Sequence, residues 1–238
     1  MPTASGPVRP SRAERREEVW GRIIESGRRH LAEEGAAALS LRAVTRDLGM
    51  VSSAVYRYVA SRDDLLTLLV VDAYTELADA VDAASGSARG GFVAQVVTLA
   101  TAMRRWALAE PARYALLYGS PVPGYEAPGE VTVGPGTRVL LRLVRLIDEG
   151  VTSGAVPAGA GRVALPRVLG PDLEEIKAQV GAQAADAPTM ARGVFLWTAL
   201  VGAVSSEVFG HLGAETFARP EVAFEHQVRL AIAVVTDP

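Results

Sequence analysis

The spacing of apolar residues near the start of the chain predicts an amphipathic helix. Over residues 12–34 they recur every three or four positions, the period of one helix face. They are Val19, Trp20, Ile23, Ile24 and Leu31. Ser11 and Glu14 have the spacing of a capping box that begins the helix, and Gly35 is placed to end it.

A pair of shorter helices follows, within residues 40–60. Leu41, Val44 and Leu48 have helical spacing, and Gly49 supplies a residue that tolerates a left-handed turn. Val55 and Val59, four residues apart, predict a second short helix with these side chains facing inward. Two short helices joined by a tight turn that contains glycine form a helix-turn-helix, whose second helix enters the major groove of DNA.

The rest of the chain also has a helical pattern, so we predict an all-α fold. Ser61 is placed as the N-cap of a helix from residue 62 to about residue 84. Further helices are predicted at residues 92–109, 111–118, 137–152, 171–180, 188–212 and 220–235. Residues 85–91 are a predicted linker, and residues 119–136 a long loop rich in glycine and proline.

These elements divide the chain into an N-terminal head and a C-terminal body. The predicted divisions are a disordered arm at 1–10, a helix-turn-helix DNA-binding domain at 11–60, a connecting helix at 61–84 and a helical ligand-binding and dimerisation domain at 92–238. A length of 238 residues is sufficient for a small head and a body of ordinary domain size.

Charge is distributed unevenly between head and body. Residues 9–62 hold 11 arginines and 7 acidic residues, whereas residues 63–238 hold 13 basic and 20 acidic residues. A basic head on an acidic body is typical of a DNA-binding protein whose second domain has another partner. Cysteine is absent, no apolar run approaches 20 residues, and the first residues lack a signal-peptide pattern. We expect a soluble, cytoplasmic protein without membrane association.

Residues 49–66 of the head read GMVSSAVYRYVASRDDLL and form a signature around Gly49, Tyr56, Ser61 and Leu65. In the spacing of these four residues the head resembles the tetracycline-repressor (TetR) family of transcriptional regulators. Residues 106–128 and 197–202 are similar to the WHG-type C-terminal domain of one branch of the family. Val201 stands where that pattern has histidine, so no role of the imidazole is carried over.

The resemblance implies which head residues contact DNA. Arg42 matches a position that reads a base edge, and Arg pairs bidentately with guanine. Ser52, Ser53 and Arg57 occupy positions of the recognition helix that face DNA. The candidates for phosphate contacts are Ser40, Tyr56, Tyr58 and Arg62. The implied partner is double-stranded operator DNA.

The body is predicted to hold a small-molecule effector and to pair with a second copy. Aromatic residues are scarce in the chain but gather on three predicted helices, together with the adaptable Met103. The candidate ligand-binding residues are Phe92, Met103, Trp106, Tyr114, Tyr118, Phe195 and Trp197. We expect a neutral or weakly polar hydrophobic effector. The two last helices are apolar around much of their circumference, which predicts a homodimer.

We find no enzyme motif in the sequence. The three histidines, His30, His211 and His226, have no metal-ligand spacing, and neither a nucleophile elbow nor a phosphate-binding loop is present. We expect no catalytic residue, metal or cofactor. The favoured function is a ligand-released repressor. An architectural or activating DNA-binding protein without an effector remains open, as does a ligand-sequestering or enzymatic body with a vestigial head.

Overall fold

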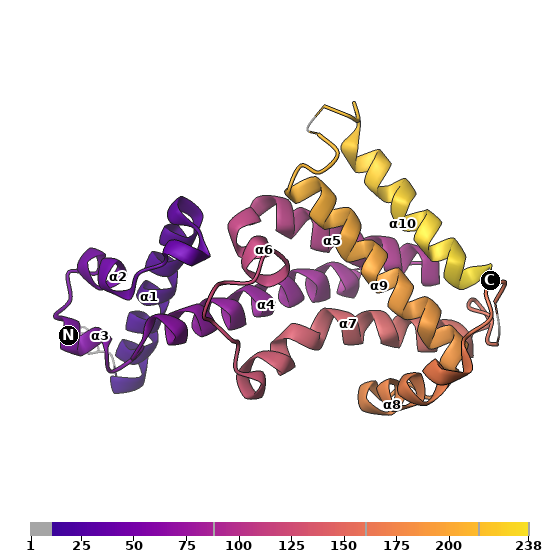
Figure 1. Ribbon diagram of the computed structural model, residues 1–238, viewed down its shortest axis with the longest axis horizontal. Helices are drawn as coiled ribbons and strands as arrows, with labels where there is room; N and C mark the ends of the chain where they lie inside the picture. The colour runs from indigo at the N-terminus through magenta and orange to yellow at the C-terminus, as the bar shows by residue number, and fades with distance from the viewer. Residues whose placement is uncertain (1–10, 88, 160, 214, 238) are drawn as a thin grey trace, which may run out of the picture.

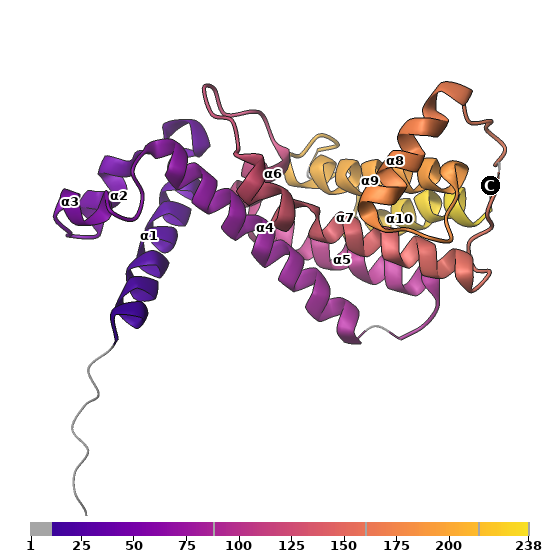
Figure 2. The ribbon, with the colours of Figure 1, turned by 90° about the horizontal axis from the view of Figure 1, so that it is seen from below.

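The computed structural model describes residues 11–87, 89–159, 161–213 and 215–237, and all regular structure in those ranges is helical. The predicted disordered arm at 1–10 lies outside them. The head contains α1 (Arg12–Glu34), the short η1 (Ala36–Ala38), α2 (Leu41–Asp47) and α3 (Ser52–Val55). From the head, α4 (Arg62–Ser87) runs into the body, so the molecule is elongated, with the head at one end (Figures 1 and 2).

The predicted helix ends in the head are confirmed. The Ser11 hydroxyl accepts a hydrogen bond from the Glu14 amide at 3.1 Å, and the Glu14 carboxylate accepts one from the Ser11 amide at 2.6 Å. Gly35, with φ of 77°, follows α1, and Gly49, with φ of 60°, makes the turn after α2. Both glycines therefore hold left-handed backbone conformations that other residues rarely adopt.

The head has a hydrophobic core of its own to which α4 contributes. Val55 and Val59 are buried in it, as their spacing predicted. The other buried members are Ile23, Leu39, Leu41, Val44, Leu65, Leu66 and Leu69. Gly27 brings α1 close to α4, since a Cβ there would lie 3.1 Å from the Leu69 side chain.

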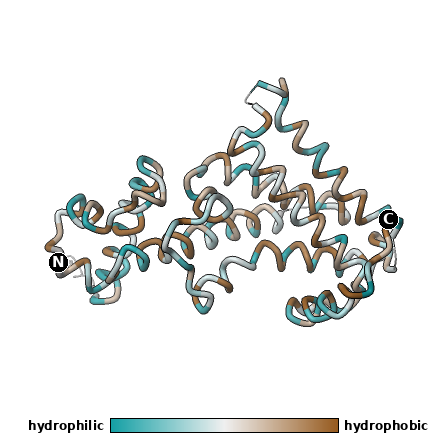
Figure 3. The backbone as a smooth tube through the Cα atoms, viewed as in Figure 1, coloured by the Kyte–Doolittle hydropathy of each residue, from teal (hydrophilic) through white to brown (hydrophobic). Residues whose placement is uncertain are grey.

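The described part of the body contains six helices and η2 (Arg167–Leu169) beside the C-terminal part of α4. They are α5 (Phe92–Ala109), α6 (Pro111–Tyr118), α7 (Gly129–Thr152), α8 (Gly170–Val180), α9 (Ala187–Val208) and α10 (Pro220–Thr236). Helix α4 packs against three of them, α5, α6 and α7. Helices α9 and α10 lie side by side on one flank of the body (Figure 1). Hydrophobic and hydrophilic residues alternate along most helices (Figure 3), as one buried and one exposed face require.

The predicted loop at 119–136 is shorter than expected, because α7 begins at Gly129 and contains Pro135. Glycine and proline disfavour a helix interior. Here the packing against α4 outweighs that preference: at Gly136 an added Cβ would lie 3.2 Å from the Tyr74 ring. Thr132 also donates its hydroxyl proton to the Pro128 carbonyl at 2.8 Å. The tertiary contacts were not visible in the local composition.

Two further helix ends differ from the predictions by three or four residues. Helix α4 continues through Ser87, so the predicted linker begins three residues later than expected. Helix α9 ends at Val208 instead of residue 212, and the left-handed Gly210 follows it. By length and composition alone α9 could cross a membrane, a property that core helices of soluble proteins share.

Candidate nucleic-acid interface and body cavities

The helix-turn-helix presents a small polar surface around α2 and α3. Arg42 is exposed on α2, and Arg57 and Tyr56 are exposed in the turn that follows α3, Tyr56 to 41%. The buried Val55 and Val59 hold this segment from the opposite side. The helical part of the predicted recognition segment is only four residues long. The side chains of Ser52 and Ser53 lie outside the described part of the structure.

Polar contacts hold the end of α2, and with it the helix-turn-helix, against α1. The His30 ring nitrogen Nε2 lies 2.7 Å from an Asp47 carboxylate oxygen, and the Arg22 guanidinium donates to the Leu48 carbonyl at 3.0 Å. The hydrogen bond with His30 holds the pKa of Asp47 below its ordinary value. These contacts join the end of α2 to α1, so the polar surface around α2 and α3 has a rigid support.

Ser40 and Tyr58, two of the predicted phosphate contacts, also have structural roles. The Ser40 hydroxyl caps α2 by accepting from the Ala43 amide at 3.4 Å. Tyr58 is half-buried, with its ring edge-on to Trp20 at a centroid distance of 6.1 Å. A serine cap can still donate its own hydroxyl proton to a phosphate oxygen.

Arg62 faces the protein backbone and not the polar surface. Its guanidinium donates to the carbonyls of Leu39 at 3.1 Å, Ala36 at 3.0 Å and Ala37 at 3.1 Å, at the end of η1. Nε and Nη2 are thereby engaged, and Nη1 lies 3.5 Å from an Asp63 carboxylate oxygen, so a phosphate would have to compete with these partners. We therefore leave Arg62 out of the proposed DNA contacts.

Replacing Arg62 should destabilise the head. In Arg62→Ala three carbonyls lose their donor, and we expect the free energy of unfolding to fall by about 1–3 kcal/mol. Chemical denaturation followed by circular dichroism measures this change. If Arg62→Ala instead unfolds like the parent protein and weakens binding to every DNA sequence, Arg62 is a phosphate contact after all.

The predicted ligand-binding residues mostly fill the body core. Phe92, Met103, Trp106 and Tyr114 are between 0% and 7% exposed, and Tyr118 and Trp197 pack against the same cluster. Burial raises the pKa of the Tyr118 hydroxyl above its ordinary value. Phe195 differs, since it is 49% exposed on α9. Sequence reasoning placed the aromatics on the right helices but could not show that most of them pack against one another.

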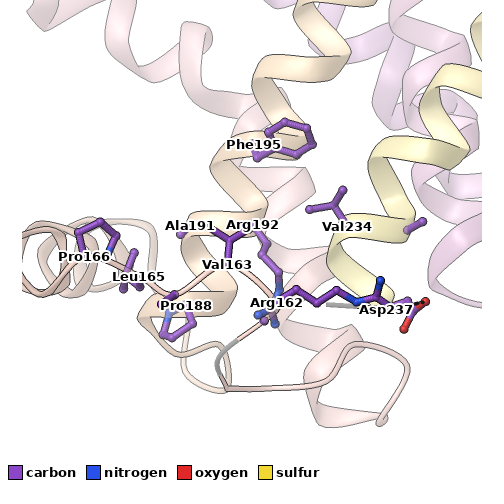
Figure 4. A pocket seen from close by; sticks show the side chains of 13 residues that line it. Arg162, Val163, Leu165, Pro166, Pro188, Ala191, Arg192, Phe195, Val234 and Asp237 are labelled. Atoms are coloured by element: carbon purple, nitrogen blue, oxygen red, sulfur yellow. Dashed lines mark ion pairs between the residues drawn. The ribbon is translucent and has the colours of Figure 1, made fainter.

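Three cavities lie outside this aromatic cluster, in the body and at its boundary with the head. One of about 650 Å³ is lined by residues 161–166, the first half of α9 and the end of α10, and Phe195 is part of its wall (Figure 4). A second of about 490 Å³ lies between the end of α9 and the start of α10. A third of about 400 Å³ separates the end of α1 from α6.

A network of ion pairs around the buried Arg113 connects head and body, a feature that the sequence analysis missed. Arg113 of α6, 2% exposed, lies 3.0 Å from the Asp72 carboxylate and 2.8 Å from that of Glu76, both on α4. Arg28 of α1 lies 2.8 Å from each of the same two carboxylates. The indole of Trp106 donates to Glu76 at 3.2 Å. Acidic residues four apart within the apolar part of α4 were the available signal.

A basic helix-turn-helix head on a helical body defines the class of DNA-binding transcriptional regulators. Residues 23–69 match the family described as "Bacterial regulatory proteins, tetR family", and residues 96–231 match "Tetracyclin repressor-like, C-terminal domain". The chain belongs to the TetR family of transcriptional regulators, whose members bind operator DNA and typically dimerise. The predicted family, all-α fold and non-enzymatic class are thereby confirmed.

Relatives and solved structures agree with this assignment. The HTH-type transcriptional regulator Rv1816 of Mycobacterium tuberculosis is 47% identical over 227 residues, which cover 95% of this chain and 96% of that protein. The crystal structure of regulatory protein SCO4313 has a TM-score of 0.74 and 29% identity, covering 94% of this chain and all of that one. A tetR-family regulatory protein from Rhodococcus RHA1 shares the fold, with a TM-score of 0.60 and 17% identity over 96% of this chain and all of that one.

Proposed function

We propose that this protein is a homodimeric repressor that a small molecule releases from its operator. The observation that carries the DNA-binding part is the surface formed by Arg42, Tyr56 and Arg57, held by the buried Val55 and Val59. In this arrangement α3 enters the major groove, and Arg42 and Arg57 reach base edges. Ser40, Tyr56 and Tyr58 face phosphate oxygens.

Replacing Arg42 should remove sequence discrimination. If Arg42 pairs with a guanine, Arg42→Ala loses about 1–3 kcal/mol of specific binding and accepts other bases at one position of each half-site. Fluorescence anisotropy over a panel of operator variants measures both effects. Arg46, also exposed on α2, provides the control: Arg46→Ala should keep the base preferences. Equal losses on every operator variant would make Arg42 a phosphate contact.

The proposed dimer forms through the exposed face of α9 and α10. Val194 and Leu230 are 45% and 58% exposed there, part of an apolar surface that a second copy would cover. Gly202, inside α9, has no atom within 4 Å of an added Cβ. A glycine in the middle of a helix costs stability. At this position the missing side chain would allow a partner helix to approach α9 closely. Two heads would then reach half-sites about 34–36 Å apart.

Release of the operator DNA requires that ligand binding in the body changes the position of the head. The charge network of Arg28, Asp72, Glu76 and Arg113 supports this step, since it joins α1 and α6 through α4. A ligand among the aromatic residues would act near Trp106, which donates to Glu76. The size of the resulting population shift is limited by the difference in ligand affinity between the two states.

The proposed function is tested by selecting bound fragments from genomic DNA and titrating the complex with hydrophobic small molecules. We expect a pseudo-palindromic site and a compound that lowers the affinity for it. If a specific site emerges but no compound changes binding, the architectural or activating alternative is favoured. If no specific site emerges, the head is vestigial and the proposal fails.

A further inference from the structure

The cavity of about 650 Å³ beside α9 has an apolar wall and a charged end. Its apolar members come from the loop before η2, from the first half of α9 and from the end of α10. They include Val163, Leu165, Pro188, Ala191, Phe195 and Val234. Its charged members are Arg162, Arg192 and Asp237, which come together near the end of α10 (Figure 4). A volume of this size suits a small organic molecule.

Arg192 is a buried cation that is bonded to neutral groups. It is 8% exposed and donates to the Gly159 carbonyl at 2.7 Å, the Pro157 carbonyl at 2.6 Å and the Thr189 hydroxyl at 3.0 Å. Its Nε has no partner, and within the described ranges no carboxylate oxygen lies within 4.0 Å of the guanidinium. A buried charge of this kind is costly unless an opposite charge accompanies it.

Asp186, the acidic residue closest in sequence, is not bonded directly to the guanidinium. One of its oxygens accepts from the amide and the hydroxyl of Thr189 at 3.0 and 2.6 Å, and the other accepts from the Gly159 amide at 2.8 Å. It therefore caps α9 and holds the loop. Burial lowers the pKa of Arg192, although the charge of Asp186 acts in the opposite direction.

A second cation lies at the rim of the same cavity. Arg162 faces Asp237 at 4.0 Å, and both side chains are about four-fifths exposed, at 80% and 82%. An exposed pair at this distance is weak. The carboxylate of an incoming molecule can therefore replace Asp237 beside Arg162 at little cost.

We propose that this cavity binds a small organic carboxylate with an apolar body. The carboxylate would lie against Arg192 and Arg162, and the apolar part against Phe195 and Val234. A second copy of the chain is a poorer occupant, because an apolar side chain entering the cavity would bury Arg192 further without supplying a negative charge. The site is separate from the aromatic cluster of the body core, and carboxylate binding depends neither on DNA nor on repression.

Isothermal titration of the full chain with octanoate tests the proposal, with octanol as the uncharged probe of the same length. Octanoate should bind at least tenfold more tightly than octanol. Arg162→Gln should weaken octanoate binding at least threefold, whereas Arg167→Gln, an exposed arginine of η2 outside the cavity, should not change it. Equal affinities for the two probes, or an equal effect of the two substitutions, would overturn the proposal.

Arg192→Gln should weaken octanoate binding more strongly, at least tenfold, while leaving octanol binding nearly unchanged. Because Arg192 also holds two loop carbonyls, Ala191→Leu serves as a second variant that fills the cavity and keeps the arginine. It should reduce the affinity for both probes at least tenfold. If octanoate binds Ala191→Leu as it binds the parent protein, or does not bind the parent dimer at all, the cavity is not a carboxylate site.

Discussion

A chain with Leu230→Arg should be a monomer that has lost most of its affinity for a palindromic operator. Leu230 is 58% exposed on α10, within the apolar face that the proposed dimer buries. An arginine there would carry an unpaired charge into the interface, twice in a symmetric dimer. A dimer binds both half-sites at once, and the loss of this linkage lowers the apparent affinity by about 100-fold or more. Light scattering and anisotropy measure the two effects.

Two further variants separate this effect from a general loss of stability. Val133→Arg changes an equally exposed residue, at 60%, on α7 and outside the proposed face, and should remain a dimer. Gly202→Leu should raise the helix propensity of α9, since the added side chain has open space in the single chain, and yet weaken the dimer. A monomeric parent protein, or a dimeric Leu230→Arg, would place the interface elsewhere.

Arg113→Ala should reduce the free energy of unfolding by about 3 kcal/mol. Arg113 is 2% exposed and lies between two carboxylates of α4, so its removal breaks two ion pairs and leaves Arg28 as the remaining cation beside Asp72 and Glu76. Urea denaturation measures the loss. Arg138→Ala is a matched control, because Arg138 also lies against two carboxylates of α4, Asp79 and Asp82, but is 37% exposed. It should cost less than about 1 kcal/mol. Similar losses in the two variants would show that burial does not strengthen the network.

The same network predicts how stability depends on pH. Hydrogen bonding to Arg113, the largest influence, lowers the pKa of Glu76 in the folded protein. A lowered pKa stabilises the fold above the pKa of the unfolded chain, and this contribution is lost as the pH falls through the folded value. The parent protein should therefore lose stability on acidification more steeply than Arg113→Ala. Parallel melting curves of the two proteins between neutral and acidic pH would contradict the assigned role of Arg113.

Local signals predicted the elements of the head accurately. The capping box at Ser11, the left-handed Gly49 and the inward Val55 and Val59 each follow from chemistry within four residues along the chain. The elements of the body were harder to predict, because the contacts that determine them join segments that are distant in the sequence. Pro135 lies inside α7 because of packing against α4, which no local preference expresses.

For the candidate site residues, too, the sequence predicted some features and not others. Their exposure in the head followed from helical period, and Arg42 and Arg57 are exposed as expected. The direction of a long side chain could not be predicted from this period. Arg62 turns toward the carbonyls of Leu39 and Ala36 instead of the polar surface. Arg192 is the one basic residue within α9, a signal that was available in the sequence, but its burial without a carboxylate appears only in three dimensions.

Because α4 belongs to both hydrophobic cores, the head is not an interchangeable module that ends where the helix-turn-helix ends. Leu65, Leu66 and Leu69 complete the core of the head, and from Ala73 onward the same helix contributes to the core of the body. An excised head that stops at residue 60 would lack those three leucines and expose the apolar faces that they cover. Chimeras that exchange DNA specificity between relatives should therefore be joined between residues 69 and 73, and must also match Arg28 to Asp72, at the junction, and to Glu76, beyond it.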